Sequence, residues 1–132
     1  MLITVDTSVV MAVLLEEEDK KAIIAQTDGQ HLQAPPSISW EVGNALSSLL
    51  RRNLITIEEA TSAIEIFDGI PIRMAEVDLV PAVELANRHK IYAYDAFVIE
   101  CARKYRTPLL SLDRAQCRTA KSEGVEIIEI KS

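Results

Sequence analysis

Two short apolar segments of this chain share one design, and that design limits the folds open to it. Residues 2–5 (Leu-Ile-Thr-Val) and 109–112 (Leu-Leu-Ser-Leu) lack a regular polar alternation, and each is followed at once by an aspartate, Asp6 or Asp113. Such strands are typical of a parallel sheet that helices cover on both faces. Segments with helical periodicity follow each aspartate, so the sequence predicts an α/β fold.

The rest of the chain continues this alternation, without repeats or linkers. Strands are predicted at residues 2–5, 31–34, 70–74, 108–112 and 125–130. Helices are predicted at residues 8–15, 19–26, 37–52 and 114–122, with others that begin near 56, 78 and 95. Pro71 indicates that strand 70–74 lies at a sheet edge, because proline cannot donate a ladder hydrogen bond. Thr56 and Glu59 form the pattern of a helix capping box.

The length of 132 residues fits a single domain, 1–132. No apolar run approaches the length of a membrane span, and Asp6 stands where a secretory signal would need a basic flank. We therefore expect a cytoplasmic protein without a membrane partner. Cys101 and Cys117 have no close-spaced partner, which favours reduced thiols over a disulfide or a zinc site.

The net charge of -6 argues against a protein that binds nucleic acid by bulk electrostatic attraction. The charge is uneven, however. Residues 1–87 contain 5 Lys or Arg and 14 Asp or Glu, whereas residues 88–132 contain 9 and 6. Aromatic residues make up only 5%, which is too few for an RNA-binding sheet that works by stacking bases.

Four acidic residues are candidates for one functional site. Asp6 and Asp113 end parallel strands, whose carboxyl ends line the edge where ligands bind in such sheets. Asp95 begins the most apolar helix. Each of these three aspartates could instead be a plain helix N-cap. Glu41 shares a polar stripe beside an apolar helical arc, and that stripe could be a cleft wall or an ordinary boundary facing water. The other members of this stripe are Ser37, Asn44 and Ser48.

Convergence of these acids would have a definite chemical consequence. Carboxylates that gather in one place repel each other and need a cation to stay ionised. Oxygen ligands without nearby Cys or paired His suit Mg²⁺ or Mn²⁺ rather than zinc. Such an ion can activate a bound water and neutralise charge on a phosphodiester, so phosphoryl chemistry is expected.

Four segments, taken in order, resemble the motifs of the PIN-domain nucleases, and more narrowly those of VapC-type toxins of type II toxin-antitoxin modules. These segments are Val5-Asp6-Thr7-Ser8, Glu41-Val42-Gly43-Asn44-Ala45-Leu46, Tyr94-Asp95-Ala96 and Leu110-Ser111-Leu112-Asp113. The resemblance covers essentially the whole chain. It implies a three-layer α/β/α PIN-like fold whose central parallel sheet has the strand order 3-2-1-4-5.

The resemblance also implies a Mg²⁺- or Mn²⁺-dependent endoribonuclease toxin. In that interpretation Asp6, Glu41 and Asp95 hold the ion, and Asp113 supports the ion or the attacking water. A metal-bound water would hydrolyse RNA to a 5′-phosphate and a 3′-hydroxyl. The polar residues expected to orient the acids are Thr7, Ser8, Asn44 and Ser111. A cognate antitoxin protein is the implied inhibitor, and a homodimer is the implied assembly.

An acidic site needs a basic rim to hold RNA. Arg114, one residue past Asp113, is the best-placed candidate, and Arg88 and Lys90 are further candidates. Weaker candidates are Arg51, Arg52, Arg103, Lys104, Arg106, Arg118 and Lys121. His89 is expected to be a surface residue rather than a catalytic base.

Three other functions can be weighed on the sequence. Phosphotransfer through an aspartyl phosphate is disfavoured, because Ser8 stands where the phosphatases of that class need a second Asp and no suitable late Lys is found. A housekeeping RNA-processing nuclease of the same family stays open. A non-catalytic interaction domain, in which the acids are only caps, also stays open. The Mg²⁺ affinity of the wild type against Asp6→Asn separates this last alternative from an enzyme.

Overall fold

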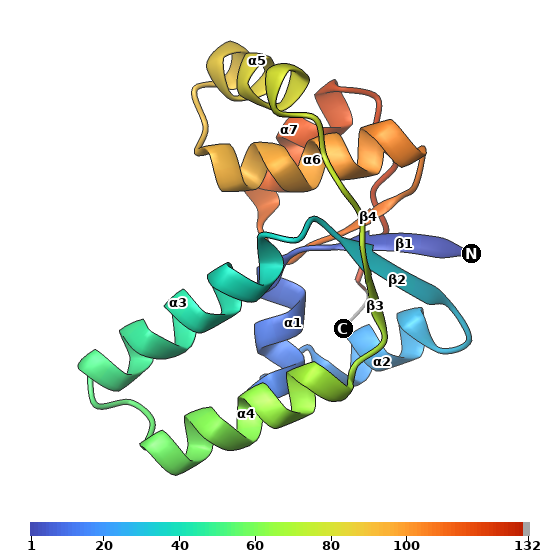
Figure 1. The fold of residues 1–132 in the computed structure, drawn as a ribbon. Coiled ribbons are helices and arrows are strands. Elements are labelled where there is room, and N and C mark those ends of the chain that lie inside the picture. The colour runs from blue at the N-terminus through green and yellow to red at the C-terminus, as the bar shows by residue number, and fades with distance from the viewer. Residues whose placement is uncertain (131–132) are drawn as a thin grey trace.

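A four-stranded parallel sheet forms the centre of the computed structural model, which describes residues 1–130 (Figure 1). The strands are β1 (Leu2–Val5), β2 (His31–Ala34), β3 (Ile72–Met74) and β4 (Leu109–Leu110). They lie in the order β3-β2-β1-β4, and all pairs are parallel. The strand after Pro71 is at an edge, as the sequence predicts.

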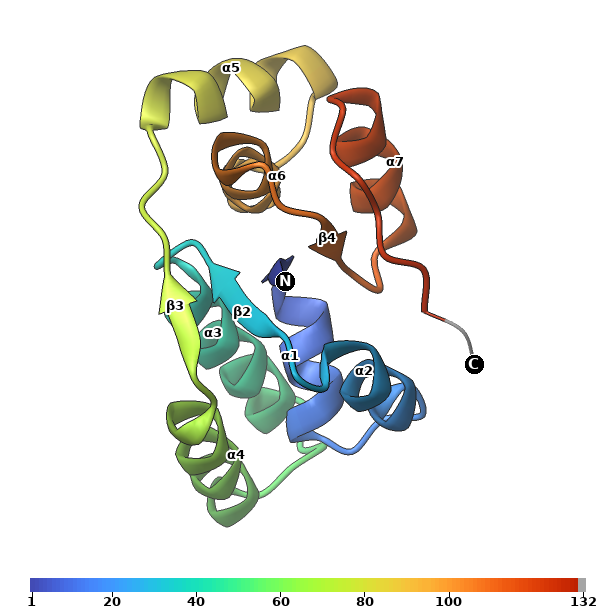
Figure 2. The same cartoon turned by 90° about the vertical axis from the view of Figure 1, so that its right-hand side faces the viewer.

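Helices cover both faces of the sheet and make a three-layer α/β/α fold (Figure 2). One layer contains α1 (Thr7–Leu14), α2 (Lys20–Thr27), α3 (Ile38–Arg51) and α4 (Ile57–Gly69). The other contains α5 (Leu79–His89), α6 (Ala93–Tyr105) and α7 (Arg114–Ser122). No helix in residues 1–130 combines the length and the apolar character that a membrane span requires.

Alternation along β1 divides the interior into two cores. Ile3 and Val5 are buried in a core shared with α1, α3 and α4. Thr4 points to the α6 side, where its hydroxyl lies 2.6 Å from that of Thr107 and accepts a 2.9 Å bond from Gln33 Nε2. Burial of these polar groups is tolerated because they bond to one another. β1 is thus packed on both faces, and this packing fixes the position of Asp6, which follows it.

The predicted fifth strand at residues 125–130 is wrong. This segment runs beside β4 but makes only one parallel bridge, between Leu109 and Ile127. Its two ladder bonds both involve the backbone of Leu109, at 2.9 Å each. β4 is only two residues long, because the chain turns toward α7 directly after it. A two-residue strand offers too short a ladder for a full partner.

Local capping chemistry sets where several helices begin. Asp6 and Asp113 are N-caps, accepting bonds from Val9 N at 3.2 Å and Gln116 N at 3.1 Å. The predicted capping box of Thr56 and Glu59 is confirmed. Asp95 is not a cap, since α6 begins at Ala93. The two cysteines are free thiols.

Candidate active site

Asp6 is the most buried of the four predicted acids, with only 4% of its surface exposed. It directly follows β1 and therefore lies at the carboxyl edge of the parallel sheet. Its Oδ1 accepts bonds from the Ser8 hydroxyl at 2.6 Å and from Val9 N at 3.2 Å. Its Oδ2 accepts a 2.5 Å bond from the Ser111 hydroxyl. Burial raises the pKa of Asp6, and these three donors offset part of that shift.

Ser111 and Gln116 form hydrogen bonds that connect the segments carrying Asp6, Asp95 and Asp113. The Ser111 hydroxyl, which bonds Asp6, lies 3.5 Å from Gln116 Oε1. Gln116 Nε2 donates to the backbone carbonyl of Asp95 at 3.2 Å, and Gln116 N donates to Asp113 Oδ1 at 3.1 Å. One side chain, 5% exposed, therefore ties the start of α7 to the start of α6 and to the end of β4.

Glu41 enters from the opposite helical layer, in the first turn of α3. Burial raises its pKa to about 7, and Asp95 and Asp6 contribute to the increase by repulsion. The nearby Thr7 hydroxyl lowers the pKa in part. Even so, neither Glu41 Oε2 nor Thr7 Oγ1 has a well-formed hydrogen bond to any group in residues 1–130, although both are buried. A buried carboxylate oxygen without a donor needs either a proton or a cation.

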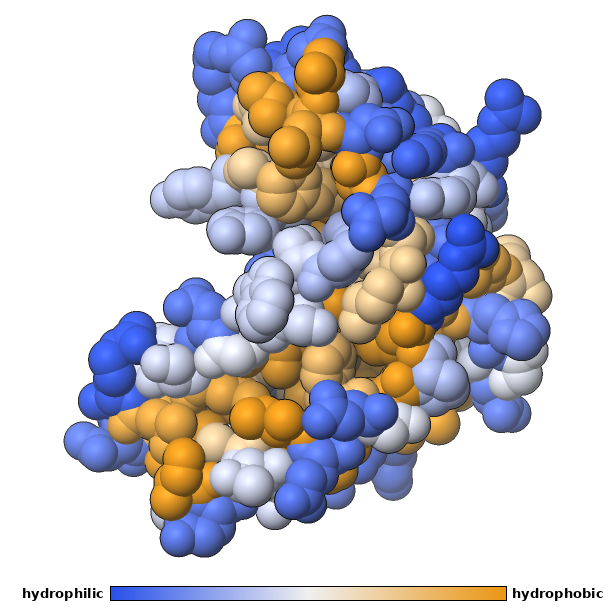
Figure 3. All heavy atoms as spheres, viewed as in Figure 1, coloured by the Kyte–Doolittle hydropathy of each residue, from blue (hydrophilic) through white to orange (hydrophobic). Residues whose placement is uncertain are grey.

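Mutual repulsion links the four carboxylates electrostatically. Asp113 raises the pKa of Asp6, and both Asp113 and Asp6 add to the effect of burial in raising the pKa of Asp95. Each of the four acids, at the starts of α1, α3, α6 and α7, therefore interacts electrostatically with at least one of the others. On the face in Figure 3 the surface is hollowed between α3 and the α5–α6 layer. These repulsions place the four carboxylates near one another at this edge of the sheet.

The donor set fits a hard divalent cation in its chemistry. Carboxylate and hydroxyl oxygens suit Mg²⁺ or Mn²⁺. The pKa values of three carboxylates are raised, so a positive charge nearby would stabilise their ionised forms. The orphaned Glu41 Oε2 is a free ligand atom. Within residues 1–130, however, no three acidic, His or Cys side chains are already arranged around one ion position.

The other predicted residues divide into two groups. Ser8, Ser111 and Thr7 lie against the acids, as described above. Asn44 is exposed, and no hydrogen bond joins it to Glu41 in the part of the chain that the structure describes. Arg114 is exposed beside Asp113.

Neither Arg88 nor Lys90 forms an ion pair with any of the four acids in residues 1–130. Arg88 Nη2 pairs with Glu123 Oε1 at 3.0 Å, at the far end of α7 from Asp113. Lys90 Nζ donates to Asn87 Oδ1 at 3.2 Å. His89 also bonds Glu123, at 2.6 Å, and thus has a structural partner.

Gln116 is a residue of the candidate site that was not predicted from the sequence. A signal was available, since Asp113 and Gln116 have the spacing of a capping box. The backbone half of that box forms, but the Gln116 side chain turns to Asp95 instead of to its own cap. That destination depends on the packing of α6 against α7, which spacing along the chain does not reveal.

Comparison with known proteins agrees with this arrangement. The sequence profile of the PIN domain matches residues 3–122. Ribonuclease VapC3 from Pyrobaculum aerophilum is 31% identical over 119 residues, which are 86% of this chain and 91% of the relative.

Two solved structures share the fold at low identity. VapBC2 from Rickettsia felis, bound to a DNA fragment from their promoter, gives a TM-score of 0.68 at 9% identity and covers 97% of this chain and 98% of that chain. VapC20 from Mycobacterium tuberculosis, a sarcin-ricin loop cleaving toxin, gives 0.64 at 15% identity, with 96% and 98% covered. These two likenesses show the fold, and the profile match and the VapC3 identity show the family: the chain belongs to the PIN-domain family, in its VapC branch.

Proposed function

We propose that this chain is a divalent-metal-dependent endoribonuclease toxin that hydrolyses RNA phosphodiester bonds. The observation that carries the proposal is the group of four interacting carboxylates, three of them with raised pKa values. A group of this kind is stable as ions only with a cation present. The names of the relatives VapC3, a ribonuclease, and VapC20, a sarcin-ricin loop cleaving toxin, support RNA as the substrate.

We assign Asp6, Glu41 and Asp95 to the ion, with Asp113 as a support for the ion or for the attacking water. When bound, Mg²⁺ or Mn²⁺ supplies an activated water and neutralises charge that develops at the phosphorus. Asp113 is the most exposed of the four, which leaves its outer oxygen open to solvent and substrate. The three less exposed acids are the better ligands, because burial makes an unneutralised charge costly.

The chain's own polar groups have the task of orientation. Ser8 and Ser111 fix the two oxygens of Asp6, so that this carboxylate loses little conformational freedom on binding an ion. Thr7 stands beside Glu41. Gln116 holds the starts of α6 and α7 together, and in this way it fixes the distance between Asp95 and Asp113.

RNA cleavage by purified protein tests the proposal. We expect total RNA to be cut with Mg²⁺ or Mn²⁺ and left intact with a chelator, with 5′-phosphate ends on the products. Asp6→Asn and Asp95→Asn should reduce cleavage below detection, and growth arrest should be lost with it. Asparagine keeps the N-cap at position 6, so the free energy of unfolding should hardly change. Asp68→Asn, an exposed position on α4, is the matched control and should cleave normally.

Retention of cleavage by both site variants, in protein prepared free of metal contaminants, would refute the assignment. Cleavage that is unaffected by a chelator would refute the metal requirement.

We also propose two protein partners, a cognate antitoxin that inhibits cleavage and a second copy of this chain. The VapBC2 complex, a structural relative, supports the first. An exposed apolar face on α5 supports the second, and it consists of Leu79, Val80 and Val83. Apolar spheres gather over α5 in Figure 3.

A further inference from the structure

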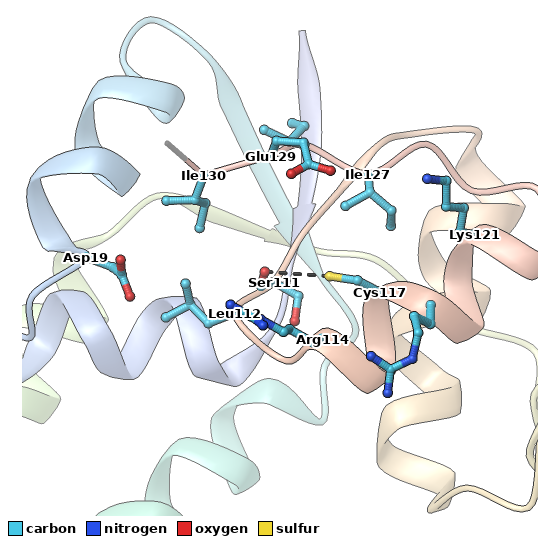
Figure 4. Close-up of a pocket in the computed structure, with 11 residues that line it drawn as sticks. Asp19, Ser111, Leu112, Arg114, Cys117, Lys121, Ile127, Glu129 and Ile130 are labelled. Carbon is cyan, nitrogen blue, oxygen red and sulfur yellow. Dashed lines mark hydrogen bonds between the residues drawn. The ribbon is translucent and has the colours of Figure 1, made fainter. Parts of the chain in front are cut away.

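A second hollow lies on the other side of the connection between β4 and α7. It has a volume of about 600 Å³, and α7, the segment 127–130, Leu112 and Asp19 line it (Figure 4). Ser111 contacts both the carboxylate site and this hollow. Its hydroxyl donates to Asp6, whereas its carbonyl accepts the Cys117 thiol at 3.7 Å beside this hollow. The hollow is therefore separated from the carboxylates by a single connecting loop.

Three cations of α7 line this hollow, namely Arg114, Arg118 and Lys121. Their spacing of four and three residues places them on one side of the helix. All three side chains are exposed, and they form no ion pair with any residue of the described chain. Arg88 and Arg103, by contrast, are both held by Glu123. The α7 cations are thus free to meet an anion.

The rest of the lining adds an apolar surface and two acids. Leu112, Ile127 and Ile128 are partly buried and face the same space. Asp19 and Glu129 reduce the positive charge without cancelling it, because three cations face two anions. A ligand with repeated negative charges and flat apolar rings satisfies both kinds of lining. Single-stranded nucleic acid has that chemistry in every nucleotide, whereas an acidic peptide has such rings only where it contains aromatic residues.

We propose that this hollow holds the stretch of RNA next to the scissile bond, with phosphates on Arg114, Arg118 and Lys121 and a base against the apolar lining. This inference rests on the proposed nuclease function. Arg114 provides the continuity, since it is adjacent to Asp113 and also lines the hollow. From Arg114 to Lys121 the helix rises about 10 Å, so a strand can contact all three cations in passing. The hollow then supplies the attraction for RNA that the acidic site itself lacks.

Binding of a labelled, single-stranded RNA oligomer by the Asp6→Asn protein tests this inference without cleavage. Into that protein we would introduce Arg118→Gln together with Lys121→Gln. The matched control is Lys21→Gln with Arg73→Gln, which removes the same charge from exposed positions outside the lining of this hollow. We expect the hollow variant to raise the Kd at least about fivefold, and to reduce the salt dependence of log Kd by about 1.4, at 0.7 for each phosphate contact. The control should leave both nearly unchanged.

A chemical footprint gives a second, local readout. Acetylation of lysines, followed by mass spectrometry, should show Lys121 protected when RNA is bound. Lys104, which pairs with Asp78 on the α6 side, should react equally with and without RNA. Equal reactivity of Lys121 in both states would overturn the inference.

Failure of this inference can be told apart from failure of the proposed function. If the wild type cleaves RNA but the hollow variant binds and cleaves like the control, the nuclease stands and the hollow has no part in RNA binding. If an oligoglutamate peptide binds in a Lys121-dependent way while RNA binding ignores Lys121, the hollow belongs to an acidic protein segment and the inference falls. If RNA binds through Lys121 yet no cleavage occurs with any metal, the hollow stands and the nuclease proposal falls.

Discussion

At the scale of single residues, Asp6 is the acid of the candidate site whose carboxylate is held by the most hydrogen bonds in residues 1–130. Three donors hold its two oxygens, and two of those donors are serine hydroxyls from different ends of the chain. Hydroxyls at such positions orient a ligand and keep it in its charged form. The role we assign to Ser8 and Ser111 is therefore positional, and it has measurable consequences.

Ser111→Ala should lower the rate of RNA cleavage by about 10- to 100-fold, because Asp6 loses a hydrogen bond that orients it. Ser111→Thr keeps the hydroxyl and should restore most of the rate. A purely structural role would lower the free energy of unfolding and leave the Mg²⁺ dependence unchanged. We expect instead that the Mg²⁺ concentration for half-maximal cleavage rises in Ser111→Ala and returns in Ser111→Thr.

Glu41 and Asn44 should differ sharply in effect, although they lie one helical turn apart. Glu41→Gln removes a proposed ligand, whereas Asn44 is exposed and has no bond to Glu41 in the structure. Asn44→Ala should therefore reduce cleavage much less than Glu41→Gln. The reverse ranking would contradict this division of roles.

The raised pKa of Glu41, about 7, predicts how stability depends on pH without metal. The folded state holds a proton that the unfolded chain releases near pH 4.5, so the free energy of unfolding should fall as pH rises from about 4.5 through 7. At pH 8, divalent ions at a concentration of a hundred times their Kd should raise the free energy of unfolding by about 2.7 kcal/mol. At pH 5 the increase should be smaller. Thermal unfolding measures both effects.

Glu41→Gln is the control for this pH dependence, because it removes the titrating group. Its melting temperature should change less between pH 5 and pH 8 than that of the wild type. An equal slope in the two proteins would show that Glu41 is not the group responsible.

At the scale of elements, the two strand–aspartate–helix units were predictable from sequence, and the reason is local. β1 with α1 and β4 with α7 each depend on an apolar run and on a cap whose donor is three residues along the chain. The capping box of α4 and the edge position of β3 were predictable for the same reason. Parallel pairing then brings the two aspartates to one edge.

Features that depend on distant partners were not predictable. The segment 125–130 has strand composition but only Leu109 to pair with. Arg88 was a candidate for RNA binding, yet Glu123, 35 residues away, binds it. The Gln116 side chain selects the Asp95 carbonyl, 21 residues back, over its own helix start. Each outcome is decided by helix packing rather than by local spacing.

Glu123 holds α7 against α5 and α6. Its carboxylate, 12% exposed, binds His89, Arg88 and Arg103, and these bonds lower its pKa to about 2. Glu123→Gln should reduce the free energy of unfolding by about 1.5–3 kcal/mol. Because the folded-state pKa is lowered, this contribution is present above about pH 4.5 and is lost as pH falls toward 2.

Urea unfolding at pH 7 and pH 3 would check this prediction for Glu123. Glu126→Gln, an exposed neighbour that forms no ion pair with residues 1–130, is the control and should leave stability unchanged. A loss in Glu123→Gln of the same size at both pH values would contradict the ionic origin.

At the scale of the whole molecule, charge and apolar surface are distributed in separate regions. The acidic first part contributes Asp6 and Glu41, while the basic last part contributes α7 with its free cations. The proposed RNA binding therefore depends on which face of the molecule meets the RNA, and not on the net charge of -6.

The apolar face of α5 predicts an oligomer. Leu79, Val80 and Val83 are each more than half exposed on one helix, and a two-fold axis could pair this face with its copy. Light scattering after gel filtration should give the mass of a dimer. Val80→Glu with Val83→Glu should give a monomer, whereas Ile64→Glu, an exposed residue of α4, should remain dimeric. A monomeric wild type would contradict the proposed homodimer.

The most direct test of the account is a crystal structure of the wild type grown with Mn²⁺, with the ion located by anomalous scattering. We predict a single cluster of density within coordination distance of Asp6, Glu41 and Asp95, with Asp113 directly or through water beside it. An anomalous map that is empty there, with the four carboxylates directed to separate surfaces, would contradict the central claim.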